Sequence, residues 1–395
     1  MMKVKNPDLS KDIVPVYKVI GAEGEDILSI IVRIGSRNEN ASYAGIIHYI
    51  EHIILKLRVD GLTIDEWVNI FNINNELATN REMLSLTFKG ERQALSRFSN
   101  IIYRAFKDVS FRTNDFESVK LDILNEIDFR AINKDKKIDD LIHKTIWTDP
   151  LGRNILGTKN TVKRLSASDV SSCLSTIVNN NDMFIITTQD EDIVWSFQSR
   201  SSDLKYIRPS QKNKFNPCSI NIKTANNAVK EYCLLFPFKF LSKSKKSKLP
   251  FLSKVLSDPS GLLYNLLRKK YNLVYFLIAY PIVYEYESAL IVRFVASSNN
   301  LEQVRKIILS SFSSNKDSLI PDYLLKKVSL KLKDEISEVV HSKKEITNLL
   351  KYTLFNSNQA SFELYKDRML NTTRDGLISL VSKLDLKNIS IMEVE

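Results

Sequence analysis

The chain has 395 residues, enough for two domains of about 200 residues each, both with a substantial core. Its formal net charge is +11, but the positive residues are scattered, and the one dense cluster, KSKKSK at 243–248, lacks interleaved aromatic residues. These features argue against a nucleic-acid-binding protein. Cys173, Cys218 and Cys233 have no metal-like spacing, so we expect reduced, mostly buried thiols rather than a disulfide framework.

No stretch of the sequence predicts a membrane segment. The first residues, MMKVKNPDLSKD, lack the apolar core of a signal peptide, and no apolar run approaches the length that crosses a bilayer. We therefore expect a cytoplasmic protein with neither a membrane nor a nucleic-acid partner.

The predicted elements follow the same plan in both halves of the chain. The first half predicts a strand near 13–34, helices near 44–56 and just after it, a strand near 82–89, helices near 92–107 and 114–133, and a strand near 184–188. The second half predicts strands near 219–236 and 273–296, helices near 301–312, 322–340 and 374–384, and a strand near 389. This pattern indicates an α+β protein of two homologous domains, 1–205 and 206–395, each an antiparallel-rich sheet packed with helices. The linker is expected within 199–217, which is rich in Ser, Lys, Asn and Pro.

Two of the four histidines lie in the segment His48-Tyr49-Ile50-Glu51-His52, an H-x-x-E-H pattern. Residues four apart lie one turn apart on the same face of a helix, so His48 and His52 can direct imidazole nitrogens at one ion. Glu51 projects from nearly the same face and could act as a general base. The pattern also fits a second interpretation, in which two core histidines make backbone hydrogen bonds beside a solvated glutamate. His143 and His341 lie outside any motif and are expected to be partly exposed helix residues without a role.

A zinc site of this kind needs a third protein ligand from another part of the chain. The predicted helix at 114–133 carries apolar residues at helical spacing, and Glu126 lies on that apolar side. A carboxylate turned toward a core is costly unless it is paired or bound to a metal, which favours Glu126 as the ligand. Glu117 is the alternative, although near the helix start it could merely complement the helix dipole. Asp122 is expected to be exposed.

Several segments, in order, resemble the insulinase or pitrilysin family of metallopeptidases, M16, in its short two-domain form. HYIEH and LNEI resemble the family's metal-binding segments. LGRNILGTKNTVKRLSASDV at 151–170 and IVNNNDMFIITTQD at 177–190 resemble the end of its first domain, and GLLYNLLRKKYNLVY at 261–275 resembles a segment of its second. The resemblance implies the metallohydrolase fold of mitochondrial processing peptidase and LuxS.

The resemblance also implies a catalytic metal site. One Zn²⁺ per chain would be held by His48, His52 and Glu126, with Glu51 as the general base. The family usually has a glutamate seven residues before the third ligand, where this chain has Val119.

Two further residues follow from the resemblance, in the domain without the H-x-x-E-H pattern. Arg268 and Tyr275 would hydrogen-bond the substrate and stabilise a developing oxyanion. Without the family, the same residues fit an exposed arginine and a strand tyrosine. The segment Glu76 to Gly90 occupies the place of the family's substrate-binding edge strand, and it shows Glu76-Leu77-Ala78 where the family often has asparagine.

These observations predict a zinc-dependent endopeptidase that cleaves short or unfolded peptides, in precursor processing, leader-peptide removal or general peptide turnover. By resemblance, two chains would face each other as a clamshell, as a homodimer or as a heterodimer with an M16-like homologue. Arg268 and Tyr275 would then reach the partner's zinc site. The alternative function is a non-catalytic peptide-binding or scaffold subunit, which Val119 and the altered start of the edge strand favour.

Overall fold

The computed structural model describes residues 3–5, 13–179, 182–190, 192–197, 205–210, 212–222, 229–356 and 362–394. Most of the amino-terminal segment and part of the predicted linker lie outside these residues. The chain forms two compact units, and each takes in one segment from the other half of the sequence. Unit 1 comprises 1–137, 149–210 and 338–362, and unit 2 comprises 138–148, 211–337 and 363–395. A single cut at residue 205 therefore does not describe the two exchanged segments.

Unit 1 is built on a six-stranded sheet with the strand order β1-β2-β8-β3-β7-β6. Its strands are β1 (Lys3–Lys5), β2 (Val16–Ile20), β3 (Asp26–Val32), β6 (Asn74–Thr79), β7 (Leu84–Gly90) and β8 (Met183–Thr187). Neighbouring strands are antiparallel except β2 and β8, which are parallel. The single strand predicted near 13–34 is two strands, β2 and β3, because the chain reverses between Gly21 and Gly24, both at positive φ.

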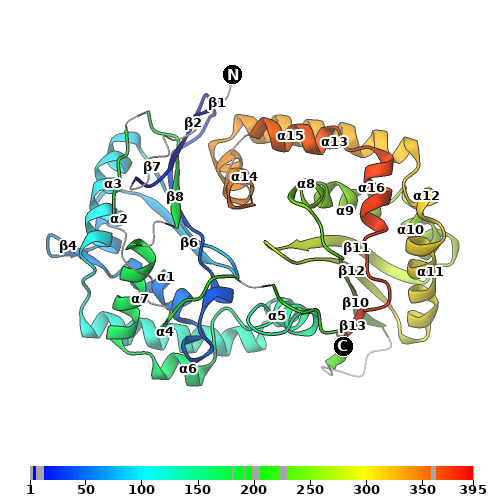
Figure 1. Ribbon diagram of the computed structural model, residues 1–395, viewed down its shortest axis with the longest axis horizontal. Helices are drawn as coiled ribbons and strands as arrows, with labels where there is room; N and C mark the ends of the chain where they lie inside the picture. Colours follow the sequence, from blue (N-terminus) through cyan, green and yellow to red (C-terminus); the bar gives the residue numbers. More distant parts are fainter. Residues whose placement is uncertain are drawn as a thin grey trace. The chain divides into compact units, whose positions relative to one another are not determined.

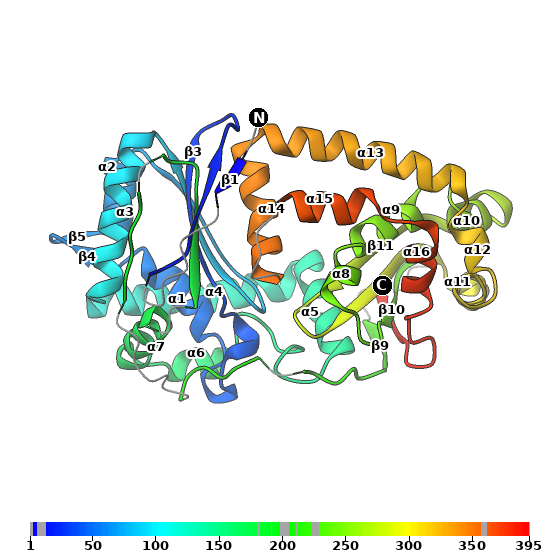
Figure 2. The ribbon, with the colours of Figure 1, turned by 45° about the horizontal axis from the view of Figure 1, so that its top comes forward.

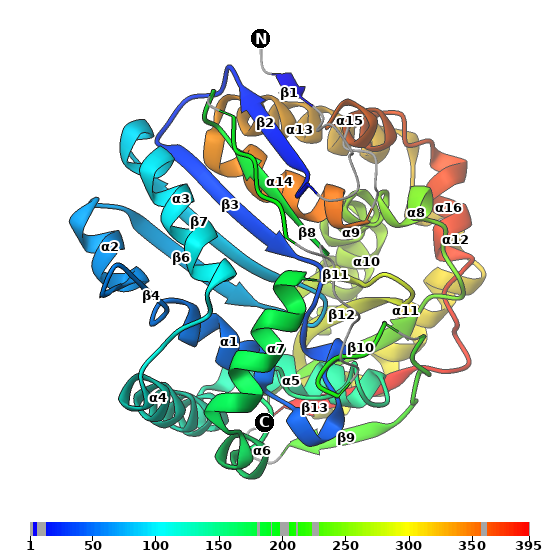
Figure 3. The ribbon, with the colours of Figure 1, turned by 60° about the vertical axis from the view of Figure 1, so that its left-hand side comes forward.

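Helices cover both faces of this sheet (Figures 2 and 3). The helices of unit 1 are α1 (Ile46–Ile54), α2 (Ile64–Ile70), α3 (Arg92–Lys107), α4 (Thr113–Ile132), α6 (Lys159–Arg164), α7 (Ala167–Asn179) and α14 (Lys343–Asn356). Helices α1, α3 and α7 pack in one layer with α4 beyond α1, and α14 contacts β2, β3 and β8 from the opposite face. Every residue of β3 is buried as a result. A small hairpin, β4 (Arg58–Val59) and β5 (Leu62–Thr63), precedes α2.

Unit 2 contains a five-stranded sheet with the order β11-β12-β10-β13-β9 (Figure 1). Its strands are β9 (Ser219–Ile222), β10 (Val229–Pro237), β11 (Val274–Val283), β12 (Ser288–Ser297) and β13 (Ser390–Val394). Its helices are α8 (Lys243–Lys246), α9 (Leu249–Ser257), α10 (Leu262–Tyr264), α11 (Leu301–Ser313), α12 (Lys316–Leu319) and α16 (Arg374–Val381). Helices α5 (Lys134–Ile146), α13 (Asp322–His341) and α15 (Phe362–Leu370) each cross from one unit into the other.

The predicted edge strand at 76–90 is wrong in its extent. The structure shows a hairpin there, in which β7 is an interior strand between β3 and β6, with Leu84, Leu86 and Phe88 buried. The edge belongs to β6, which begins at Asn74, two residues before the predicted segment. Within the described residues, no strand pairs with the other side of β6.

The isolated histidines differ from each other. His341 is exposed, as predicted, but His143 is 4% exposed, and this prediction is wrong. Its Nδ1 donates to the backbone oxygen of Asp139 at 2.8 Å, and its Nε2 shares a 2.7 Å hydrogen bond with the Tyr284 hydroxyl. The partner that buries His143 is far away in the sequence, so no local pattern could reveal it.

Two compositional predictions are testable in the described residues. None of the three cysteines, all of them among the described residues, forms a disulfide, and two of them are buried, as predicted. No helix in the described ranges combines the length and the apolar character needed to span a bilayer.

Candidate metal centre

Helix α1 supplies the two histidines of the candidate site. Its residues are almost all buried, because α1 packs between α4, α7 and the edge strand β6. His48 is buried, whereas the His52 side chain is 31% exposed. Their rings meet edge to face with centroids 4.8 Å apart, as expected for residues one turn apart on one helix face.

Helix α4 brings the carboxylate to α1. Phe116, Val119 and Ile123 are buried on one side of α4, and Glu126 is the next residue along that side. Phe116 fixes the two helices together, because its ring stacks on Tyr49 of α1 at 5.1 Å and its backbone oxygen accepts the Tyr49 hydroxyl at 2.5 Å. The packing that buries α4 therefore also directs Glu126 toward the histidines.

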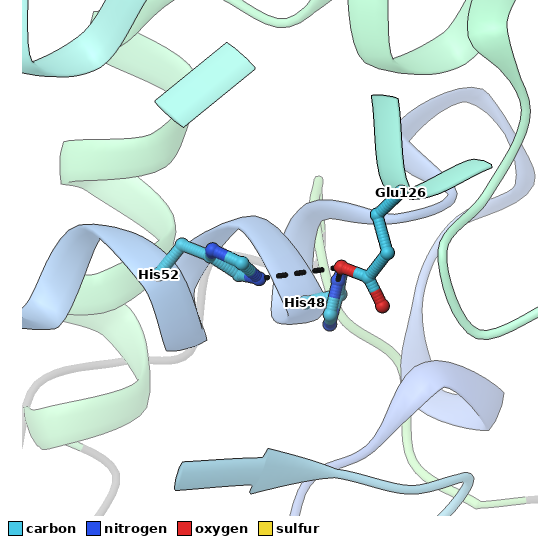
Figure 4. A group of neighbouring side chains, drawn as sticks. All are labelled: His48, His52 and Glu126. Atoms are coloured by element: carbon cyan, nitrogen blue, oxygen red, sulfur yellow. Dashed lines mark hydrogen bonds and ion pairs between the residues drawn. The ribbon is translucent and has the colours of Figure 1, made fainter. Parts of the chain in front are cut away.

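The three side chains converge (Figure 4). One ligand atom from each of His48, His52 and Glu126 lies within 4.8 Å of the others. Glu126 Oε2 is 2.9 Å from His48 Nε2 and 3.6 Å from His52 Nε2. The structure thus brings together the three residues that the sequence analysis selected from two separate helices.

Glu51 lies beside this group without joining it. Its Oε2 is 3.3 Å from His48 Nδ1, on the opposite side of the imidazole from Glu126, and its side chain is only 13% exposed. The solvated glutamate of the second interpretation is therefore excluded.

The charges of the group depend on one another. Hydrogen bonds to His48 and His52 hold the pKa of Glu126 well below its usual range. Burial alone would lower the pKa of His48, but the carboxylates of Glu126 and Glu51 raise it to about 9. Burial acts to raise the pKa of Glu51, yet the hydrogen bond and charge of His48 bring it below its ordinary value. Both carboxylates are therefore ionised at neutral pH, one as a potential ligand and one as a potential base.

The donor set fits a zinc ion. Two imidazole nitrogens and one carboxylate oxygen are a ligand set of catalytic zinc, which keeps its fourth position for water or substrate. His52 and Glu126 are partly exposed, so that position can be reached by solvent. The neighbouring acidic residues on α4 lack this placement, because Asp122 is exposed, as predicted, and Glu117 is exposed with an ion pair to Lys120 at 3.7 Å.

Arg268 and Tyr275 are neighbours in unit 2. Arg268 lies in a π-helical turn, Asn265–Lys270, a geometry frequent at functional sites. Its Nη1 donates to Asn272 Oδ1 and to the backbone oxygen of Val274, both at 3.0 Å, and its guanidinium lies 5.8 Å from the Tyr275 ring centroid. Tyr275 is 61% exposed at the start of β11. Tyr275 is thus a strand tyrosine, as the alternative interpretation expected, whereas Arg268 is only partly exposed.

Sequence reasoning missed Glu39, which is buried beside the start of α1. Its two carboxylate oxygens accept the backbone N–H groups of Gly45 and Ile47 at 2.8 and 2.9 Å. In the local sequence, Glu39 is only a lone glutamate ahead of a glycine and the first histidine. The burial of Glu39 comes from loops distant in the sequence, so the local pattern could not reveal it.

Comparisons with known proteins bear on the family and the fold. The model of the family described as Insulinase (Peptidase family M16) matches residues 27–159. The mitochondrial-processing peptidase subunit beta of Caenorhabditis elegans is 23% identical over 202 residues, which span 49% of this chain and 44% of that relative. The aligned part is thus less than half the length of that relative.

Solved structures share the fold over the whole chain. A protease from Helicobacter pylori has a TM-score of 0.83 at 15% identity, with all of both chains covered. A peptidase M16 inactive domain from Pseudomonas fluorescens has a TM-score of 0.80 at 11% identity, covering 99% of this chain and 97% of that one. At these identities, the likeness establishes the fold alone.

The fold and the site define a class: two-unit α+β proteins whose first unit carries a candidate His-His-Glu metal centre. The M16 family model matches the segment that contains all three of these residues. This match supports the predicted family, and the predicted α+β fold is confirmed.

Proposed function

We propose that the chain is a zinc-dependent endopeptidase that cleaves short or unfolded peptides. The observation that carries this proposal is the convergence of His48, His52 and Glu126 within 4.8 Å beside the nearly buried, ionised carboxylate of Glu51. The match of residues 27–159 to a peptidase family model supports it. Precursor or leader-peptide processing fits such an activity, in a cytoplasmic setting.

His48, His52 and Glu126 would hold the zinc ion, which supplies a Lewis acid and a water of lowered pKa when bound. Glu51 would accept a proton from the attacking water and return it to the leaving amine, since its low pKa keeps it ionised. Its contact with His48 fixes the orientation of the carboxylate.

We assign Arg268 and Tyr275 to the substrate on the family resemblance. An always-charged guanidinium and a phenol are donors suited to a carbonyl oxygen that becomes an oxyanion. The exposure of Tyr275 and the π-helical setting of Arg268 support this role.

The substitution Glu51→Gln tests the mechanism directly. The amide keeps the size of the side chain but cannot accept the proton, so kcat for a peptide library should fall roughly 10²- to 10⁴-fold. Zinc content, measured in the same preparations, should stay the same because Glu51 is not a ligand. Retained turnover in the variant would contradict the proposed mechanism.

A non-catalytic subunit is the second candidate function. Val119 is buried in the core at the position where the family usually has a glutamate, and one structural relative is described as inactive. The relative from Caenorhabditis elegans, mitochondrial-processing peptidase subunit beta, is itself a subunit, which supports an M16-like partner. Bound zinc without turnover, followed by turnover on addition of a homologous partner chain, would favour this function over the first.

A further inference from the structure

Helix α1 begins without a capping side chain of its own. Its first flanking residue is Gly45, at a φ of 95°, and no side chain accepts its open N–H groups from within the helix. A Cβ atom at Gly45 would lie 2.5 Å from the backbone oxygen of Leu156, so no larger residue fits there. The backbone N–H groups at this end must therefore find an acceptor from another segment.

Glu39 provides that acceptor. Its carboxylate binds the N–H groups of Gly45 and Ile47 with one oxygen each, and the residue is 3% exposed. The backbone of Glu39 is also held, because its N–H donates to Ser36 and its oxygen accepts Arg153 Nη1 at 3.2 Å. Glu39 is thus held through both its backbone and its carboxylate, and it lies outside the helix that it caps.

We propose that Glu39 is a positioning residue of the metal centre, whose carboxylate fixes the first turn of α1 and through it the metal-binding nitrogens of His48 and His52. Ile47, one of its two partners, directly precedes His48. Among the described residues, no hydrogen bond or ion pair joins Glu39 to either histidine side chain, so Glu39 positions them through the helix backbone. The inference rests on the proposed zinc function.

The charge of Glu39 gives a way to test this role. Burial raises its pKa to about 8, although its two N–H donors and the charges of Arg153 and His48 act in the opposite direction. The ionised form accepts from both N–H groups and places a negative charge at the positive end of a helix. The protonated form resembles glutamine, which offers one acceptor oxygen and turns an amide NH₂ toward the second N–H.

The experiment measures the zinc dissociation constant of the full chain and of Glu39→Gln by competition with a chelator. At about pH 9 the variant should bind zinc roughly tenfold more weakly, at the low end of what lost supporting contacts cost metal sites. At about pH 6.5 the ratio of the two constants should be smaller, because the wild-type carboxyl is then largely protonated. The cobalt-loaded proteins should also differ in their visible absorption at about pH 9, since that spectrum reports ligand geometry.

Asp26→Asn is the matched control. Asp26 is a buried carboxylate of unit 1 at the start of β3, and its donors Lys343, Thr188 and Arg92 all lie outside α1. Its loss should lower stability but leave the zinc constant unchanged. An equal loss of affinity in both variants, or none in Glu39→Gln at either pH, would overturn the inference.

Two further outcomes also test the inference. If Glu39→Gln does not fold, amide hydrogen exchange of residues 45–48 in the wild-type chain replaces the comparison of zinc affinities. Zinc should then slow exchange of these amides at about pH 9, and unchanged exchange would overturn the inference. A wild-type chain that binds no zinc would overturn the proposed function and this inference together, whereas equal binding by both chains contradicts Glu39 alone.

Discussion

At the scale of single residues, the two glutamates of α4 differ in what they face. Glu126 reaches both histidines, whereas Glu117 lies exposed beside Lys120. Both carry the same chemistry on the same helix, so only their placement separates a ligand from a surface charge. This contrast gives a matched pair of variants.

We expect Glu126→Gln to weaken zinc binding at least about a hundredfold. The substitution removes a charged ligand, and this loss should cost more affinity than the loss of a residue that only hydrogen-bonds to a ligand. Glu117→Gln should leave the zinc constant unchanged. Both constants can be measured by chelator competition on chains shown to be folded by circular dichroism. Comparable losses in the two variants would rule out Glu126 as the third ligand.

The sequence predicted the grouping of His48, His52 and Glu126 because each rests on helical periodicity. Spacing of four placed both histidines on one face, and an apolar stripe on α4 placed the glutamate toward the core. Glu39 and His143 were missed or misjudged because their burial depends on distant segments. Local patterns carry no information about such partners.

At the scale of elements, α14 docks on the sheet of unit 1 through a buried ion pair. Lys343 Nζ at its start is 2.8 Å from Asp26 Oδ1, and Thr188 and Arg92 also donate to this carboxylate. Burial acts to raise the pKa of Asp26, but these donors hold it below the ordinary value. The ionised carboxylate therefore stabilises the folded state.

Asp26→Asn should lower the free energy of unfolding by about 2 kcal/mol near neutral pH, since it leaves buried donors with a weaker acceptor. The folded pKa lies below the unfolded one, so this contribution is complete above about pH 4 and is lost as the pH falls through the folded pKa. Urea unfolding of both chains at several pH values measures the difference. A difference that grows toward acid pH would contradict the assignment.

The strands show where periodicity stops being informative. Strand β7 is buried on both faces, so its residues 84–90 form a nearly continuous buried run, and the alternation expected for an edge strand is absent. The true edge strand, β6, is mostly exposed and polar, with the sequence NNELAT, which resembles a loop. Fold class followed from the sequence, but which strand lies at the edge depended on pairing across the sheet.

At the scale of the whole molecule, two segments belong to the unit that the sequence order would not assign them to. Residues 138–148 join unit 2, where His143 bonds Tyr284, and residues 338–362 join unit 1, where Lys343 bonds Asp26. A linker search based on composition finds one boundary and cannot detect such exchange.

The proposed pairing of two chains makes a prediction that distinguishes its possible arrangements. If Arg268 serves the partner's zinc site, mixing Glu51→Gln chains with Arg268→Ala chains creates one intact site in each mixed dimer, formed by Glu51 of one chain and Arg268 of the other. Each variant alone should be nearly inactive, and an equal mixture after subunit exchange should regain about a quarter of wild-type kcat/KM, since half of the dimers carry one working site of two.

The control for this experiment is a mixture of Glu51→Gln chains with Glu51→Gln,Arg268→Ala chains, in which no site can be complete. It should stay inactive under the same exchange conditions. If the first mixture also stays inactive while mass measurements show mixed dimers, then Arg268 serves its own chain's site. Activity of the Arg268→Ala chain alone would instead remove Arg268 from the catalytic set and leave the zinc group and Glu51 to account for turnover.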